Sequence, residues 1–144
     1  MVPLCAKNLF DNSTMDTTGG WKGSKKMVKE DDAGKENRHL LVTAKKRDAV
    51  SFSQEVDTKG VFSLTVKLRY RTKDYVGRGF EFRGIRLGGG STYFDRTFTA
   101  DGQWHEMTLN FTQVQGSKKI NFSFIVLQGE GEVCFDDITV EADK

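Results

Sequence analysis

Two adjacent carboxylates, Asp136 and Asp137, lie in the last apolar stretch of the chain, GluValCysPheAspAspIleThrVal from Glu132. Like charges side by side in a strand are unfavourable unless a positive charge lies next to them. A hard cation such as calcium would provide that charge, because it binds several oxygen ligands, carboxylates among them. The pair therefore raises the question of which positive group compensates it.

A row of basic residues is the second feature with a capacity to bind. Residues 61–73 alternate strictly, and the polar side of this predicted strand carries Lys67, Arg69, Arg71 and Lys73. Guanidinium groups bind carboxylates and sulfates through paired hydrogen bonds, and they also bind sugar hydroxyls. The row is either the floor of a binding groove or a solvated outer face that discourages edge pairing.

Other polar residues are expected beside this row. Arg83, together with Arg86, is expected on the neighbouring strand. Amide and hydroxyl side chains of three further segments are expected to share the same face: Gln54, Asn121, Ser123 and Gln128. Such groups hydrogen-bond ligands in small-molecule sites.

Aromatic residues supply flat surfaces for stacking. Tyr75 and Tyr93 lie on or near predicted loops, so we expect them to be freer than the aromatic residues within strands. The alternation places Trp104 on the polar face of its strand, where its ring would be exposed. A local bulge would instead turn the ring inward, and the sequence leaves both orientations open.

The sequence contains little that supports an enzymatic function. His39 and His105 do not lie in a metal-ligand or nucleophile motif. A glycosidase needs two carboxyl groups on either side of the scissile bond, and neighbours on one strand such as Glu132 and Asp136 do not provide that arrangement. We therefore predict no catalytic activity.

The composition is that of one globular domain of 144 residues, with 37% hydrophobic and 29% charged residues. A formal net charge of +2 does not indicate a nucleic-acid partner, and the apolar segment 2–6 is too short to span a membrane. Two cysteines, Cys5 and Cys134, do not form a disulfide framework, and Cys134 is expected to be a buried apolar residue. A monomer is expected.

Short alternating segments separated by turns dominate the chain, which contains 15 Gly, 11 Phe and one Pro. We predict an all-β fold, a two-sheet antiparallel jelly-roll β-sandwich with neighbouring termini. The domain is expected over 8–141, with a disordered or cloning-derived end at 1–7 and a C-terminal end at 142–144. The strands are expected near 27–28 and over 39–44, 49–56, 61–73, 77–87 (with a bulge at Gly84), 92–99, 105–112, 119–127 and 132–141.

Several motifs occur in the order found in one family. The opening AsnSerThrMetAsp from Asn12, the pair Gly20–Trp21, the strand 62–71, Trp104 ahead of 108–111, and PheAspAspIle from Phe135 follow one another at matching spacing. Over 8–141 the chain resembles carbohydrate-binding modules of families 4 and 22 and their relatives in the galactose-binding-like superfamily. The resemblance implies that Trp21 packs in the domain and does not serve as a binding platform.

The resemblance implies a structural calcium ion that ties the N-terminal segment to the closing strand. Its ligands would be Thr14, Asp16, Asp137 and a backbone carbonyl near Arg38, while Asp136 is the weaker candidate. The sequence has Ser13 where the family has glycine and the shorter Asp16 where a glutamate is common. Ordinary turn and capping roles are the alternative for Asp16 and Asp137.

The resemblance also implies a function: non-catalytic binding of a soluble polysaccharide by an extracellular module attached to a larger secreted enzyme. The basic row adds the expectation of an anionic chain. The rival hypothesis is a protein-interaction or spacer sandwich without sugar binding. The expected ligand-binding residues are Lys67, Arg69, Arg71, Arg83, Tyr75, Tyr93, Trp104, Asn121 and Gln128.

Overall fold

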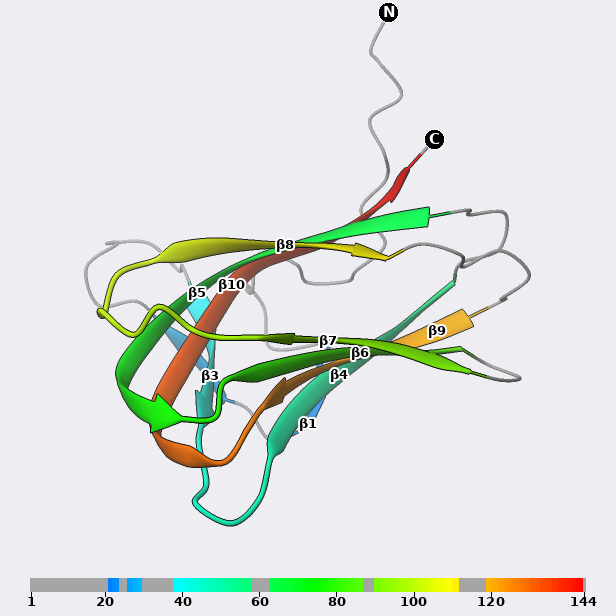
Figure 1. Ribbon diagram of the computed structural model, residues 1–144. Coiled ribbons are helices and arrows are strands. Elements are labelled where there is room, and N and C mark those ends of the chain that lie inside the picture. The colour runs from blue at the N-terminus through cyan, green and yellow to red at the C-terminus, as the bar shows by residue number, and fades with distance from the viewer. Residues whose placement is uncertain are drawn as a thin grey trace, which may run out of the picture.

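The computed structural model describes residues 21–23, 26–29, 38–57, 63–86, 90–111 and 119–143. These residues form two five-stranded sheets that face each other (Figure 1). Sheet I has the strand order β2-β3-β10-β5-β8, and sheet II has the order β1-β4-β9-β6-β7. The strands are β1 (Lys22–Gly23), β2 (Lys26–Lys29), β3 (Arg38–Thr43), β4 (Val50–Asp57), β5 (Ser63–Gly77), β6 (Phe80–Arg86), β7 (Ser91–Arg96), β8 (His105–Phe111), β9 (Lys119–Val126) and β10 (Gly129–Asp143).

All the strand pairings described are antiparallel, which confirms the predicted β-sandwich. Among the described residues no helix is long and apolar enough to cross a membrane. The predicted closeness of the termini involves the segment 1–20, which also contains Cys5 and lies outside the described part of the chain. Strand β10 continues to Asp143, past the domain limit expected at residue 141.

The core lies between the sheets and is rich in phenylalanine. Strand β4 alternates buried and exposed residues, as expected for a strand with one face on a core. The rings of Phe52 and Phe124 stack 5.0 Å apart, and Trp21 meets each of them edge-on at 5.6 and 5.7 Å. The predicted packing role of Trp21 is therefore confirmed.

Gly84 does not mark a bulge, contrary to the prediction. Strand β6 pairs with both neighbours in one unbroken register, in which Gly84 lies opposite Phe122 and Thr92. The residue points inward, and a Cβ atom there would lie 2.7 Å from the Phe111 ring. Glycine is needed at this position because an aromatic ring of sheet I fills the space that a side chain would occupy.

Two bulges occur instead between β5 and β10. The register shifts between Glu130 and Glu132, and again between Asp136 and Thr139. The extra residues, Asp74 on β5 and Asp137 on β10, have positive φ angles of 53° and 49°. Aspartate tolerates this left-handed conformation better than most residues. Each bulge places two neighbouring residues on the outer side of the strand, after which inward-facing and outward-facing residues alternate again.

Candidate functional site

The predicted ligand-binding residues divide between opposite faces of the sandwich. Lys67, Arg69 and Arg71 lie on β5 of sheet I, whereas Arg83 lies on β6 and Asn121 on β9 of sheet II. The prediction that they share one face is therefore wrong. Alternation assigns a residue to one side of its strand, but it does not identify the sheet to which that strand belongs.

The centre of the outer face of sheet I is closed. His39, Cys134 and Asp136 occupy outward positions on β3 and β10, yet they are 2%, 0% and 4% exposed. The Trp104 ring lies over this face, with its centroid 6.0 Å from the His39 ring. The guanidinium carbons of Arg69 and Arg71 lie 5.0 and 4.9 Å from the Trp104 ring. The half-buried Trp104 therefore packs against its own chain instead of presenting an open stacking surface.

Acidic neighbours accompany the basic row. Arg69 Nη1 lies 3.1 Å from Asp137 Oδ2, and the register places Arg69 next to Glu106 on β8 and Asp136 on β10. Lys73 lies opposite Glu132. The row is therefore part of a mixed-charge surface and not a positively charged groove.

The thiol of Cys134 is not a reactive group. Burial raises its pKa, and this effect outweighs the nearby charges of Lys73 and Arg71, which lower it. Its expected role as a small buried residue is confirmed, although it lies on the outer side of sheet I and not between the sheets.

Tyr75 is not a free loop residue, contrary to the prediction. It is 7% exposed and belongs to the core, where its ring meets Phe98 edge-on. Its hydroxyl accepts a hydrogen bond from Gly79 N at 2.9 Å and lies 3.2 Å from the carbonyl oxygen of Gly79. The bulge at Asp74 is the reason: without the extra residue, Tyr75 would point outward like Arg71 and Lys73.

Two other polar residues, Gln54 and Arg86, were expected beside the basic row of β5 but lie elsewhere. Gln54 is buried on the inward phase of β4. Arg86 lies over the Phe111 ring at 5.6 Å and donates a hydrogen bond to Thr92 Oγ1 at 3.2 Å. Both residues support the sandwich itself and do not join the face of sheet I.

The outer face of sheet II presents its polar side chains in rows that cross the strands. The register aligns Ser53 of β4, Ser123 of β9, Arg83 of β6 and Tyr93 of β7 in one row, which we call the middle row. One flanking row contains Glu55, Asn121, Ile85 and Ser91, and the other contains Ser51, Ile125, Glu81 and Asp95. Hydroxyl, amide, charged and aromatic groups thus share this face of four adjacent strands with Ile85 and Ile125.

Two residues give the middle row its binding capacity. Tyr93 is 60% exposed, which makes it the most exposed aromatic ring among the described residues. Arg83 donates from Nε at 3.2 Å and from Nη2 at 2.6 Å to the same Glu81 oxygen. The Glu81 side chain is 16% exposed and that of Arg83 43%, so the carboxylate holds the guanidinium in place while part of it still faces solvent.

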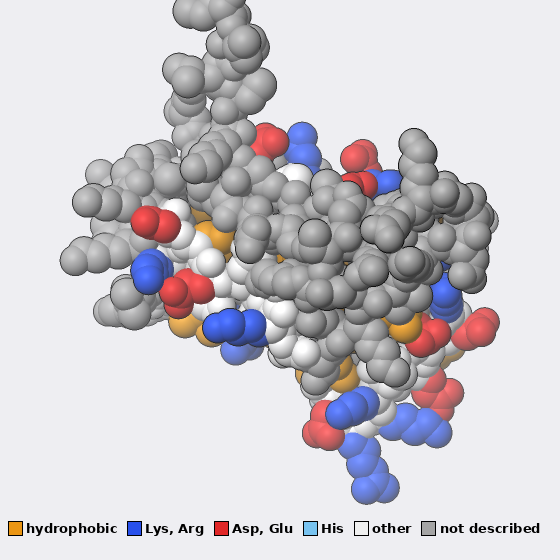
Figure 2. All heavy atoms as spheres, turned by 180° about the vertical axis from the view of Figure 1, so that it is seen from behind, with side chains coloured by type: hydrophobic (Ala, Val, Ile, Leu, Met, Phe, Trp, Pro, Cys, Tyr) orange, Lys and Arg blue, Asp and Glu red, His pale blue; other side chains and the backbone are white. Residues whose placement is uncertain are grey.

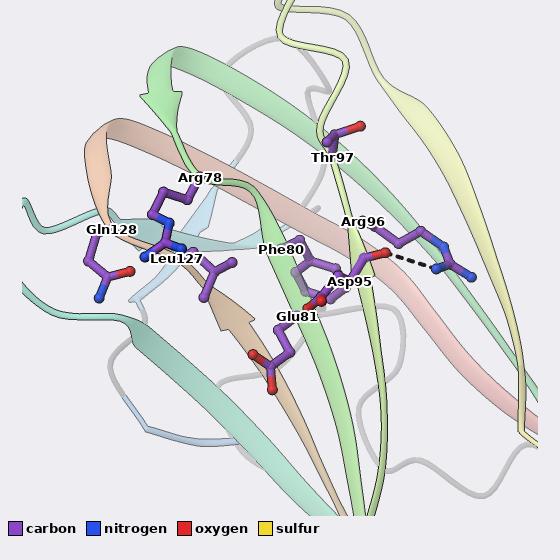
Figure 3. Close-up of a pocket in the computed structure, with 8 residues that line it drawn as sticks. All are labelled: Arg78, Phe80, Glu81, Asp95, Arg96, Thr97, Leu127 and Gln128. Carbon is purple, nitrogen blue, oxygen red and sulfur yellow. Dashed lines mark hydrogen bonds between the residues drawn. The ribbon is translucent and has the colours of Figure 1, made fainter.

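A hollow of about 710 Å³ adjoins this face at the start of β6 and the end of β7 (Figure 3). Glu81 and Asp95 of the flanking row form one side of it, and Arg78 and Gln128 lie across from them. The remaining lining residues are Phe80, Arg96, Thr97 and Leu127. Of the predicted residues, Gln128 therefore belongs to this hollow.

The sequence analysis missed Glu81, Asp95 and Arg78. The signal for Glu81 was present, because the alternation of Phe80, Phe82 and Gly84 places Glu81 on the same side as Arg83. No comparable pattern marked Arg78, which lies in the turn between β5 and β6.

On the side of the molecule opposite to the view of Figure 1, the described Lys and Arg side chains are interspersed with Asp and Glu (Figure 2).

The implied calcium site lies partly outside the described residues, since Thr14 and Asp16 belong to the segment 1–20. Within the described part, no group of three or more His, Cys, Asp or Glu side chains is arranged to hold a metal ion. The β3–β10 register ends at the pair Leu40–Phe135, so Arg38 and Asp137 each stand two residues beyond it. Asp137 already has Arg69 as a positive partner.

Neither a protein family model nor a curated protein sequence matches this chain. Solved structures do. A CBM61 module in complex with β-1,4-galactotriose matches at TM-score 0.69 and 17% identity, over 96% of this chain and 100% of that one. The CBM22-1 xylan-binding domain of Paenibacillus barcinonensis Xyn10C matches at 0.69 and 14%, over 97% of both chains.

A CBM4 structure matches at TM-score 0.65 and 14% identity, over 93% of this chain and 99% of that one. The chain has the β-sandwich fold of carbohydrate-binding modules. The predicted resemblance to families 4 and 22 is confirmed at the level of architecture. Because each match spans a carbohydrate-binding module almost end to end, the likeness covers the whole sandwich and not a single sheet.

Proposed function

We propose that this domain is a non-catalytic carbohydrate-binding module and that a glycan chain binds across the outer face of sheet II. The observation that carries the proposal is the middle row on four adjacent strands, where Tyr93 is exposed and Ser53, Ser123 and Arg83 are partly exposed. Sugar sites combine an aromatic ring with a few hydrogen-bonding groups, and this row contains both.

The dimensions of the row suit an extended ligand. Neighbouring strands lie about 4.8 Å apart, so the three spacings from Ser53 to Tyr93 cover roughly 14 Å. Lys22 of β1 pairs with Ser53 and lengthens the row by one strand. Because Glu81 fixes the Arg83 guanidinium before any ligand arrives, binding loses less side-chain entropy there.

A neutral chain fits this face better than an anionic one. The face carries charges of both signs, and Glu55 and Glu81 already pair with Lys119 and Arg83, so neither sign dominates. The full set is Lys22, Arg83 and Lys119 with Glu55, Asp57, Glu81 and Asp95. The anionic preference was expected from Lys67, Arg69 and Arg71, which lie on the opposite sheet beside acidic neighbours. We propose a soluble, hydroxyl-rich polysaccharide as the ligand.

The architecture also supports a role as an appended module. The similar structure from Xyn10C is a domain of a named larger protein, and the CBM61 structure holds an oligosaccharide. We propose that this domain belongs to a larger secreted, glycan-active enzyme, acts outside the cell as a monomeric unit, and keeps that enzyme near its substrate.

A structural calcium ion remains part of the proposal. Asp137 and the Arg38 carbonyl would hold it together with Thr14 and Asp16, and hard oxygen donors of this kind suit calcium. Arg38 and Asp137 each follow the last β3–β10 pair by two residues, and this position in the two strands supports the set. The ion would supply positive charge that locks the N-terminal segment onto β10.

Affinity electrophoresis against soluble polysaccharides tests the proposed function. Tyr93→Ala and Arg83→Ala should each abolish the retardation that the wild-type domain shows in at least one gel. Lys67→Ala is the matched control for Arg83→Ala, because it removes one exposed positive charge from sheet I. A wild-type domain that migrates freely with every polysaccharide would contradict the proposal and favour the spacer or protein-interaction role.

A further inference from the structure

The hollow beside sheet II lies next to the middle row and not in line with it. The middle row runs across the strands through Arg83 and Tyr93. The hollow begins two residues further along the same strands, at Glu81 and Asp95, and continues to Arg78 and Gln128 (Figure 3). A chain that follows the middle row would therefore pass the mouth of the hollow without entering it.

The walls of the hollow carry charges of both signs. Arg78 contributes a guanidinium group, while Glu81 and Asp95 contribute carboxylates. The guanidinium of Arg96 points away from the hollow, where it lies 5.3 Å from the Phe94 ring and donates to the Asp95 carbonyl at 2.9 Å. An anionic group would approach the two carboxylates, and a cationic group would approach the Arg78 guanidinium. A neutral group rich in hydroxyls avoids both conflicts, because each hydroxyl donates to a carboxylate and accepts from an N–H.

The hollow is already formed in the absence of a ligand. Arg78 N donates to the Gln128 carbonyl at 3.0 Å, and Leu127 N donates to the Gly79 carbonyl at 2.9 Å. The buried Tyr75 hydroxyl accepts from Gly79 N at 2.9 Å. These bonds fasten the turn between β5 and β6 to the end of β9, so two walls of the hollow are held in position and binding requires little ordering.

The volume is large enough to admit one sugar residue. At about 710 Å³ the hollow lies within the range of roughly 300–1,000 Å³ that is typical of small-molecule sites. We infer that this hollow binds a single neutral sugar residue that branches from the glycan chain on sheet II. The inference rests on the proposed function and adds that the preferred polysaccharide is branched.

Pairs of polymers that share a backbone test the inference: galactose-branched and unbranched mannan, and arabinose-branched and unbranched xylan. The wild-type domain should bind the branched member of at least one pair about tenfold more tightly, as expected for a few additional hydrogen bonds. The double variant Arg78→Ala/Gln128→Ala should lose this preference while its affinity for the unbranched member stays unchanged. Arg47→Ala removes an exposed charge outside the hollow and should bind like the wild type.

The outcomes separate the two proposals. If the wild type binds both members of every pair equally, or the double variant weakens both equally, the branch site is wrong and the proposed function stands. If no polysaccharide binds, the proposed function fails and the branch site fails with it. Should the double variant unfold, as judged by circular dichroism, the single variant Arg78→Gln gives the same comparison.

Discussion

Arg69 Nη1 lies 3.1 Å from Asp137 Oδ2, at the bulge where β10 places two carboxylates in succession. The register also puts Arg69 opposite Asp136, so one arginine has both members of the pair as neighbours. The positive charge that the adjacent aspartates require is thus supplied, at least in part, by a neighbouring strand. A calcium ion would share Asp137 with Arg69 or displace it.

Chelation tests the proposed calcium ion. EDTA should lower the melting temperature of the wild-type domain, and added calcium should restore it, because an ion that binds only the folded state stabilises that state. Asp137→Asn should melt at the same temperature with and without EDTA. An unchanged wild-type melting temperature, together with no metal by elemental analysis, would leave Arg69 as the compensating charge.

Tyr75→Phe should destabilise the domain by about 1–3 kcal/mol, because Gly79 N–H and the adjacent carbonyl groups lose a buried hydroxyl partner. Urea denaturation measures the change. Tyr93→Phe makes the same chemical change on an exposed ring and should stay within about 0.5 kcal/mol of the wild type. Equal effects of the two substitutions would contradict the assigned role of Tyr75.

Gly84→Val should destabilise the domain by about 1–3 kcal/mol, the usual cost of overpacking a core. The new Cβ would lie 2.7 Å from the Phe111 ring, which cannot retreat because Phe82, Phe94 and Phe122 surround it. Ile85→Ala, at the next and exposed position, is the control and should change stability little. Urea titrations of both variants decide the matter.

Asp101 gives a pH dependence of defined sign. Hydrogen bonds, first from Gln103 N and then from His105, lower the pKa of its carboxyl below 3.8. Stability from a depressed pKa is present above the unfolded value and is lost as the pH falls through the folded value. The wild type should therefore melt above Asp101→Asn at pH 6, and the gap should close on acidification below about 3.8. A gap that persists at pH 2 would contradict this assignment.

The alternation of apolar and polar residues was sufficient to predict the strands and most of the core. It was insufficient where the register shifts: the extra residue Asp74 reverses the side of Tyr75, and nothing in the local composition marks that bulge. Gly131 allows the bulge, because any side chain there would collide with the Asp74 carbonyl. Such contacts join residues that are distant in the sequence, so the pattern of one strand does not contain them.

Only some residues of the candidate site could be predicted, again because contacts between distant strands decide their positions. Arg83, Tyr93, Asn121 and Gln128 were identified as polar or free residues, and the structure places all of them on or beside sheet II. Arg69 and Arg71 showed the same local pattern but lie on sheet I. The pairing of strands decides between the two groups, and pairing depends on contacts that a single sequence does not reveal.

The last prediction concerns charge. If the glycan binds on sheet II, the double variant Arg69→Ala/Arg71→Ala should keep the affinity of the wild type for a neutral polysaccharide. Binding should also change little as salt rises across the physiological range, because hydrogen bonds to neutral hydroxyls are not screened as ion pairs are. Isothermal titration calorimetry at two salt concentrations measures both effects, and Arg83→Ala serves as the variant expected to lose binding. A large loss in the double variant, together with binding that weakens in salt, would instead place the ligand on the basic row of sheet I.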